Sequence, residues 1–266
     1  MKLLSQKEAK VISNKYEYND ISEFEYHRYQ MHNKGFKITN SKPLNGDKYM
    51  ATYVKYCPLG LGYYDKRRDS MTCIIGYLDK KNKSVWIGCD SLGSNGYTKS
   101  VESQSKIFRN ETFDNVIMGS TSTFRHIDLL KYSKDLFDEV DKYKDIEIDH
   151  KYMVTKFIPR VHRLFEDGVY EIDNKNKGAS FIVGAKDKLF KIQEDYSVLQ
   201  PQLGFCSVGC GESVAMGSLI TTKDDETMSI SDKIEKALES AEMYSCGVQR
   251  PFRIINTKSK EEIIIK

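Results

Sequence analysis

The order of strand-like and helix-like segments after residue 71 most constrains the fold. Strands come first, two helices follow, and strands, two helices and strands complete the chain. The strands are expected at 72–79, 83–90, 103–109, 114–119, 178–185, 188–192, 205–209, 251–256 and 262–265, and the helices at 123–140, 149–167, after Gly211 and at 230–245. This α+β order fits two sheets packed face to face between helix layers. Pro159 lacks an N–H and is expected to kink the second helix.

The first 71 residues differ in composition from the rest. They hold 13 Lys and Arg against 8 Asp and Glu, and 9 of the 17 tyrosines. The remaining 195 residues hold 28 Lys and Arg against 30 Asp and Glu, so a basic extension precedes a slightly acidic part. The extension's pattern of strand, helix and two strands predicts a small βαββ unit over 1–57, followed by a Pro- and Gly-containing linker over 58–71. We therefore expect three parts: 1–57, 58–71 and 72–266.

Composition excludes several classes of protein. No apolar run approaches the roughly 20 residues that cross a bilayer, and the first residues lack the apolar core of a secretory signal. We therefore expect a cytoplasmic protein that does not enter a membrane. Its six cysteines form no C-x-x-C pair and have no His cluster beside them, so we expect free thiols and no metal or other cofactor. A net charge of +3 does not by itself indicate nucleic-acid binding.

Three residues of the second part stand at suggestive places. Thr72 opens the first strand, and Asp90 ends its hairpin partner, so the two are expected to lie close together. Lys106 lies on the next expected strand. Each residue alone has an ordinary explanation: a β-forming Thr, a turn Asp and a solvent-facing Lys.

Together, these residues and their neighbours resemble a known family. The motifs are Thr-Cys-Ile-Ile-Gly from Thr72, Trp-Ile-Gly-Cys-Asp-Ser from Trp86, Ser-Lys-Ile-Phe from Ser105, Val-Ile-Met-Gly-Ser-Thr-Ser-Thr-Phe from Val116, Gly-Ala-Ser-Phe-Ile-Val-Gly from Gly178, Ser-Val-Gly-Cys-Gly-Glu from Ser207 and Lys-Ala-Leu-Glu-Ser-Ala-Glu-Met from Lys236. In order and spacing they resemble the proteasome β subunit and HslV, which are N-terminal nucleophile (Ntn) hydrolases. The likeness is greatest to compact proteasome-like proteins of bacteria and phages that begin Met-Thr-Cys. It implies a four-layer αββα sandwich over nearly all of 72–266.

The resemblance also implies a chemistry. Thr72 would be the nucleophile of a threonine-type endopeptidase, with its own freed α-amine as general base. Lys106 would keep that amine neutral and stabilise negative charge, and Asp90 would hold Lys106. The oxyanion donor is expected in the segment after Gly119, at the backbone N–H of Ser122. Cys210 stands at the family's auxiliary serine, and Ser245 is the nearest match to a second auxiliary serine.

The family mechanism requires Thr72 to be the first residue, whereas 71 residues precede it here. Three explanations stay open. Met71 could be a second translation start, residues 1–71 could be a propeptide removed by autolysis, or the extension could stay and block the amine. In the last case Thr72 would have an amide, which cannot act as a base, and the chain would be an inactive assembly or binding protein on an Ntn scaffold.

The resemblance further implies polypeptide substrates and self-assembly, with a ring as the family precedent. An unfoldase ATPase would be a partner by the same analogy, although no residue here indicates one. A Tyr-rich basic first unit could stack on single-stranded nucleic acid. An ordinary small domain with a solvated basic face explains the same residues better.

Overall fold

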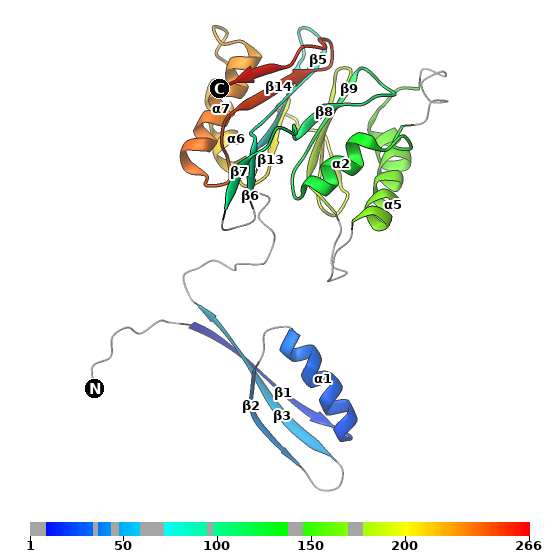
Figure 1. The fold of residues 1–266 in the computed structure, drawn as a ribbon, viewed down its shortest axis with the longest axis vertical. Helices are drawn as coiled ribbons and strands as arrows, with labels where there is room; N and C mark the ends of the chain where they lie inside the picture. The colour runs from blue at the N-terminus through cyan, green and yellow to red at the C-terminus, as the bar shows by residue number, and fades with distance from the viewer. Residues whose placement is uncertain are drawn as a thin grey trace, which may run out of the picture. The chain divides into compact units, whose positions relative to one another are not determined.

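The computed structural model describes residues 9–33, 37–43, 48–58, 72–94, 98–137, 146–169 and 178–266. The chain divides into two compact units, Met1–Lys66 and Arg67–Lys266, drawn as a ribbon in Figure 1. The expected linker lies outside the described residues from position 59, as does Met71. The boundaries at 57 and 72 therefore stay predictions.

The first unit is the expected βαββ arrangement. Strands β1 (Ala9–Tyr18), β2 (Lys37–Pro43) and β3 (Tyr49–Pro58) form an antiparallel sheet in the order β1-β3-β2, with α1 (Ile21–Asn33) between β1 and β2 in the chain. Asp20 begins the helix, since its Oδ1 accepts a hydrogen bond of 2.9 Å from the N–H of Glu23. The unit has its own buried cluster, which consists of Tyr18, Phe24, Met31, Ala51 and Tyr53.

The second unit contains two five-stranded sheets. The first has the order β13-β4-β5-β14-β15, and its strands are β4 (Ile74–Asp79), β5 (Ser84–Cys89), β13 (Phe205–Val208), β14 (Phe252–Asn256) and β15 (Ile263–Ile265). The second has the order β12-β11-β10-β9-β8, and its strands are β8 (Ile107–Arg109), β9 (Val116–Ser120), β10 (Phe181–Ala185), β11 (Lys188–Ile192) and β12 (Val198–Leu199). A hairpin, β6 (Leu92–Ser94) and β7 (Lys99–Val101), stands apart from both sheets.

Helices cover the outer face of each sheet (Figure 1). Helices α6 (Glu212–Thr222) and α7 (Ile230–Tyr244) pack on the first sheet. On the second sheet lie α2 (Phe124–Tyr132) and a continuous helical stretch, which runs from α4 (His150–Tyr152) through η1 (Met153–Phe157) to α5 (Ile158–Gly168). Helix α7 begins with a reciprocal capping box between Ser229 and Asp232.

Three apolar clusters separate the four layers. One lies between α6, α7 and the first sheet, one between the two sheets, and one between the second sheet and α2 and α5. Strand β4 serves two of them, because neighbouring side chains point to opposite faces: Ile74 packs between the sheets and Ile75 against the helices. Gly119 allows the sheets to approach, since a Cβ there would lie 2.8 Å from Ile107 and 2.9 Å from Ile74. The expected αββα sandwich is confirmed.

The structure corrects several segment boundaries. The helix expected at 123–140 ends at Tyr132, where Ser133 turns extended, and positions 138–140 lie outside the described residues. Lys106 lies just before β8 and not on a strand spanning 103–109. Pro159 stands at the second position of α5, directly after the π-helical turn of η1, in which the N–H of Ile158 bonds the carbonyl of Met153; the expected kink stays a prediction. That wider turn lets Pro159, which has no N–H to donate, stand in the first turn of α5.

Candidate active site

Thr72 lies two residues before β4 in a tightly enclosed position. Its side chain and backbone are only 5% exposed. Antiparallel pairing of Val208 with Ile74 brings the segment after β13 alongside Thr72. The N–H of Gly211 donates to the carbonyl of Thr72 at 3.3 Å, and the Cys210 Sγ lies 3.6 Å from the same oxygen.

Lys106 and Asp90 meet beside the Thr72 hydroxyl. The Nζ of Lys106 donates to Thr72 Oγ1 at 2.6 Å and to the two Asp90 carboxylate oxygens at 2.9 and 3.0 Å. Lys106 is 2% exposed and Asp90 0%. A cation this close to Oγ1 favours the alkoxide that a nucleophilic Thr forms. The structure thus brings together the three residues that the motifs single out.

The Asp90 carboxylate is fixed on both oxygens. Oδ1 accepts the N–H of Cys73 at 3.0 Å, and Oδ2 accepts the N–H of Leu92 at 2.9 Å. Burial raises the pKa of the Asp90 carboxyl, and Lys106 together with the two N–H donors opposes that increase. Because Cys73 follows Thr72 directly, Asp90 connects the backbone beside Thr72 to Lys106.

Gly209 is a requirement of the site that its sequence did not reveal. Its φ is +100°, and a Cβ at this position would lie 2.1 Å from the carbonyl oxygen of Thr72. Only glycine allows the backbone of that segment to approach Thr72 so closely. Its signal in the sequence is the Gly-Cys-Gly motif, in which Gly209 precedes Cys210.

Ser122 and Cys210 were predicted as oxyanion and auxiliary residues, and the structure places Cys210 beside the Thr72 carbonyl. Ser122 follows β9 with a φ of +75°, an uncommon backbone conformation for serine. The preceding Thr121 is buried, and its side chain would lie 3.4 Å from a Cβ on Gly209. Cys210 is exposed, and its Sγ lies 3.2 Å from the Oγ of Ser245, so both auxiliary candidates meet near the Thr72 carbonyl.

The arrangement suits covalent attack by a hydroxyl on an electrophilic carbon. It supplies an enclosed hydroxyl, a buried cation and a fixed carboxylate. The described residues contain no group of three or more His, Cys, Asp or Glu side chains that could hold a metal ion.

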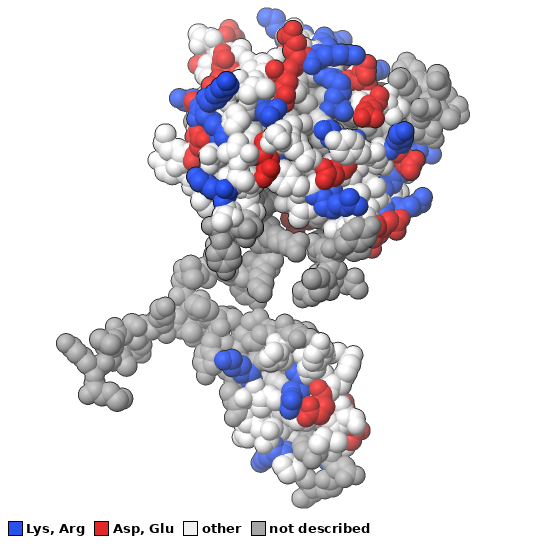
Figure 2. Space-filling model, in the orientation of Figure 1, with Lys and Arg blue, Asp and Glu red and all other residues white. Residues whose placement is uncertain are grey.

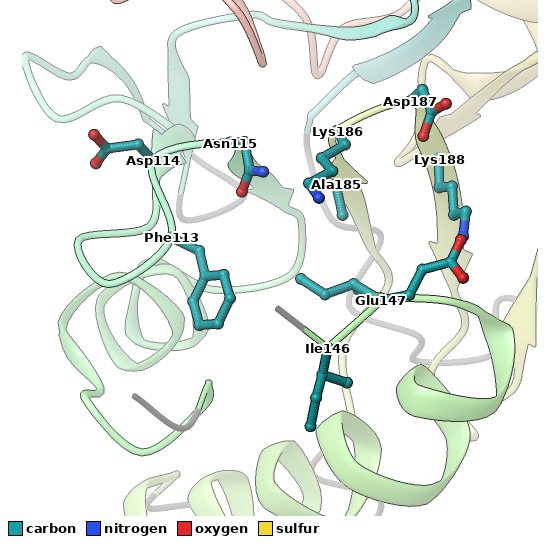
Figure 3. Close-up of a pocket in the computed structure, with 10 residues that line it drawn as sticks. Phe113, Asp114, Asn115, Ile146, Glu147, Ala185, Lys186, Asp187 and Lys188 are labelled. Atoms are coloured by element: carbon teal, nitrogen blue, oxygen red, sulfur yellow. The ribbon is translucent and has the colours of Figure 1, made fainter. Parts of the chain in front are cut away.

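A separate cavity of about 550 Å³ contains none of the predicted site residues (Figure 3). It lies where β9 begins and β10 ends, whereas Thr121 and Ser180 meet at the other end of those strands. Phe113, Ile146 and Ala185 contribute apolar walls, and Lys188 pairs with Glu147 at the rim.

Over the face drawn in Figure 2, basic and acidic side chains of the second unit alternate.

Comparison with solved structures identifies the fold. BPH of Thiobacillus denitrificans, a bacterial proteasome homologue, matches in a complex with epoxomicin with a TM-score of 0.56 at 13% identity, over 73% of this chain and 100% of that one. A second BPH structure matches with a TM-score of 0.54 at 13% identity, over 73% of this chain and 98% of that one. HslV of Trypanosoma brucei matches with a TM-score of 0.50 at 18% identity, over 70% of this chain and 98% of that one.

These matches confirm the proteasome-like and HslV-like fold that the motifs indicate. No protein-family model matches the chain, and no curated protein matches it. Among the described helices, none is both long and apolar enough to cross a membrane.

Proposed function

We propose that this protein is a threonine-type endopeptidase in which Thr72 Oγ1 attacks the peptide carbonyl. The observation that carries the proposal is the 2.6 Å hydrogen bond from Lys106 Nζ to Thr72 Oγ1, inside a buried Lys106–Asp90 pair. The likeness of the fold to proteasome homologues and HslV supports it.

The proposed reaction has two steps. The freed α-amine of Thr72 takes the Oγ1 proton, Oγ1 bonds to the carbonyl carbon, and the peptide C–N bond breaks as the amine returns the proton to the leaving nitrogen. Water then attacks the ester, gives a proton to the amine, and releases the acid while the proton restores the hydroxyl. Lys106 offsets negative charge on Oγ1, and the N–H of Ser122 stabilises the oxyanion.

Residues 1–71 must be absent from the active form, because a Thr72 joined to Met71 has an amide in place of the basic amine. Autolysis and a translation start at Met71 would both produce this form. We further propose polypeptide substrates and self-assembly into a ring, on the strength of the fold. The five cysteines of the second unit are free thiols, which supports a location in the reducing cytoplasm.

Hydrolysis of fluorogenic peptides by the purified protein tests the proposal. Wild-type protein should release the fluorophore, and epoxomicin, the compound bound by the Thiobacillus protein, should stop it. Thr72→Ala should be inactive and unmodified by epoxomicin, whereas Thr155→Ala, on an exposed threonine of η1, should react with it as wild type does. Equal hydrolysis by wild type and Thr72→Ala would refute the role of Thr72.

A second candidate is an inactive assembly or binding protein that keeps its extension. The separate buried cluster of the first unit favours it, since a propeptide needs no folded core of this kind. This candidate predicts a full-length protein by intact mass, no peptide hydrolysis, and the same oligomer size for Thr72→Ala as for wild type.

A further inference from the structure

The segment that joins β9 to α2 is fixed at its β9 end. The N–H of Ser120 donates to the carbonyl of Lys106 at 3.2 Å. Thr121 donates to the Ser180 carbonyl twice, from its N–H at 3.0 Å and from its hydroxyl at 2.7 Å. Ser122 comes next in its left-handed conformation, which persists only when the surrounding structure holds it.

The other end of the segment is fixed by an unusual helix cap. Thr123 is the N-cap of α2, yet its side chain makes no capping hydrogen bond to the helix backbone. Its Oγ1 instead lies 2.8 Å from Nδ1 of His126 and shares a hydrogen bond with it. The hydroxyl oxygen of an N-cap threonine ordinarily accepts a hydrogen bond from a backbone N–H of the first turn, whereas that of Thr123 does not.

His126 is itself held by the core. It is 2% exposed, and its ring meets that of Phe165 edge-on, with the ring centroids 4.8 Å apart. Phe165 is fully buried on α5. The Thr123 hydroxyl is therefore connected through His126 to the helix layer that covers the second sheet.

We propose that His126 is a positioning residue, which acts through Thr123 to aim the N–H of Ser122 at the oxyanion. The proposal rests on the proposed function. His126 does not touch the reacting atoms. It holds the Thr123 end of the segment while Thr121 holds the other, so that Ser122 between them keeps its left-handed conformation.

Two variants break the link with little change of shape. Thr123→Val removes the hydroxyl and keeps the branched side chain, and His126→Phe removes Nδ1 and keeps a ring against Phe165. Each should lower kcat for a fluorogenic peptide by about 10- to 100-fold and change KM less than about threefold. The variants misplace a donor that stabilises the transition state and leave substrate binding largely unchanged. The double variant should lose no more than either single one.

Thr123→Ser, which keeps the hydroxyl, should retain wild-type kcat, and so should His162→Phe, which alters an exposed histidine of α5. A merely structural role for His126 predicts a different set of results. Melting temperature and KM would then change, and Thr123→Val, which removes no core atom, would keep its kcat.

Hydrogen exchange measured by mass spectrometry tests the positioning without any catalysis. In Thr123→Val and His126→Phe the amides of 120–123 should exchange at least about tenfold faster than in wild type, while those of β11 stay unchanged. If wild-type protein hydrolyses no peptide while the two variants still show this faster exchange, the proposed function is refuted and the positioning stands. Unchanged exchange in both variants would overturn the positioning, whatever the activity.

Discussion

Lys106 Nζ lies closer to Thr72 Oγ1, at 2.6 Å, than to either carboxylate oxygen of Asp90, at 2.9 and 3.0 Å. The lysine nitrogen is therefore nearer to the hydroxyl than to its counter-ion. Because all three residues are buried, water does little to screen the effect of the cation on the hydroxyl.

Replacing Asp90 by Asn should harm both folding and activity. The amide nitrogen cannot accept hydrogen bonds, so one of the two backbone donors and one contact to Lys106 lose their acceptor, and the buried lysine loses its counter-ion. Denaturant unfolding should show a loss of about 3–5 kcal/mol, and peptide hydrolysis should fall at least about 100-fold. Glu147→Gln is the control: its side chain, paired with Lys188, is 74% exposed, so the loss should stay within about 1 kcal/mol. Equal losses in the two variants would contradict the role of the buried pair.

Gly209→Ala should abolish activity, because the new Cβ would meet the Thr72 carbonyl oxygen at 2.1 Å and the φ of +100° disfavours alanine. Gly217→Ala provides a matched control in the neighbouring helix α6, where nothing lies within 4 Å of the new Cβ. That variant should remain active and gain up to about 1 kcal/mol of stability. Activity assays and thermal unfolding distinguish the two, and an active Gly209→Ala protein would refute the close approach.

Alkylation of Cys210 by iodoacetamide should abolish the proposed peptide hydrolysis. This thiol is exposed and lies 3.6 Å from the Thr72 carbonyl, so a carboxamidomethyl group there would obstruct the site. Burial raises the pKa of Cys73, Cys89 and Cys206 to about 12, so at pH 8 they stay protonated and unreactive.

Peptide mapping within 72–266 should find label on the two exposed cysteines, Cys210 and Cys246, while residual activity is measured in parallel. Cys210→Ala should make the activity resistant to iodoacetamide, and Cys246→Ala should leave it sensitive. Inactivation that survives Cys210→Ala would assign the sensitive thiol elsewhere.

The proposed base gives the activity a definite pH dependence. A free α-amine has an ordinary pKa of about 7.7–8.0, and a nearby lysine cation lowers it by disfavouring a second positive charge. Only the unprotonated amine accepts the Oγ1 proton, so kcat/KM should fall about tenfold per pH unit below that pKa and level off above it. A profile that stays flat from pH 5 to 9 would argue against an amine base.

The meeting of Thr72, Asp90 and Lys106 could be anticipated because most of it is local. Asp90 follows the hairpin partner of the strand that Thr72 opens, and pairing of Ile74 with Cys89 brings the two together. The place of Lys106 beside them could be predicted only from the family resemblance, because a lysine before a three-residue strand gives no indication in the sequence that it is buried.

The nonlocal parts could not be anticipated. Gly209 reaches Thr72 only because β13 pairs with β4 across more than 130 residues of chain, and no local pattern specifies that pairing. The His126 link was missed because a lone histidine in an amphipathic helix has the pattern of an ordinary core residue. The helix expected to reach residue 140 ended early because Ser133 leaves the helical conformation within a continuing apolar pattern.

The most direct test of the account is the N-terminus of the active species. Native protein should be separated by size, each fraction assayed for peptide hydrolysis, and the most active fraction sequenced from its N-terminus and weighed intact. We predict that activity follows a species that begins Thr72-Cys73-Ile74, and that Thr72→Ala yields no active fraction. Activity that follows the full-length chain, with residues 1–71 still attached to Thr72, would contradict the account.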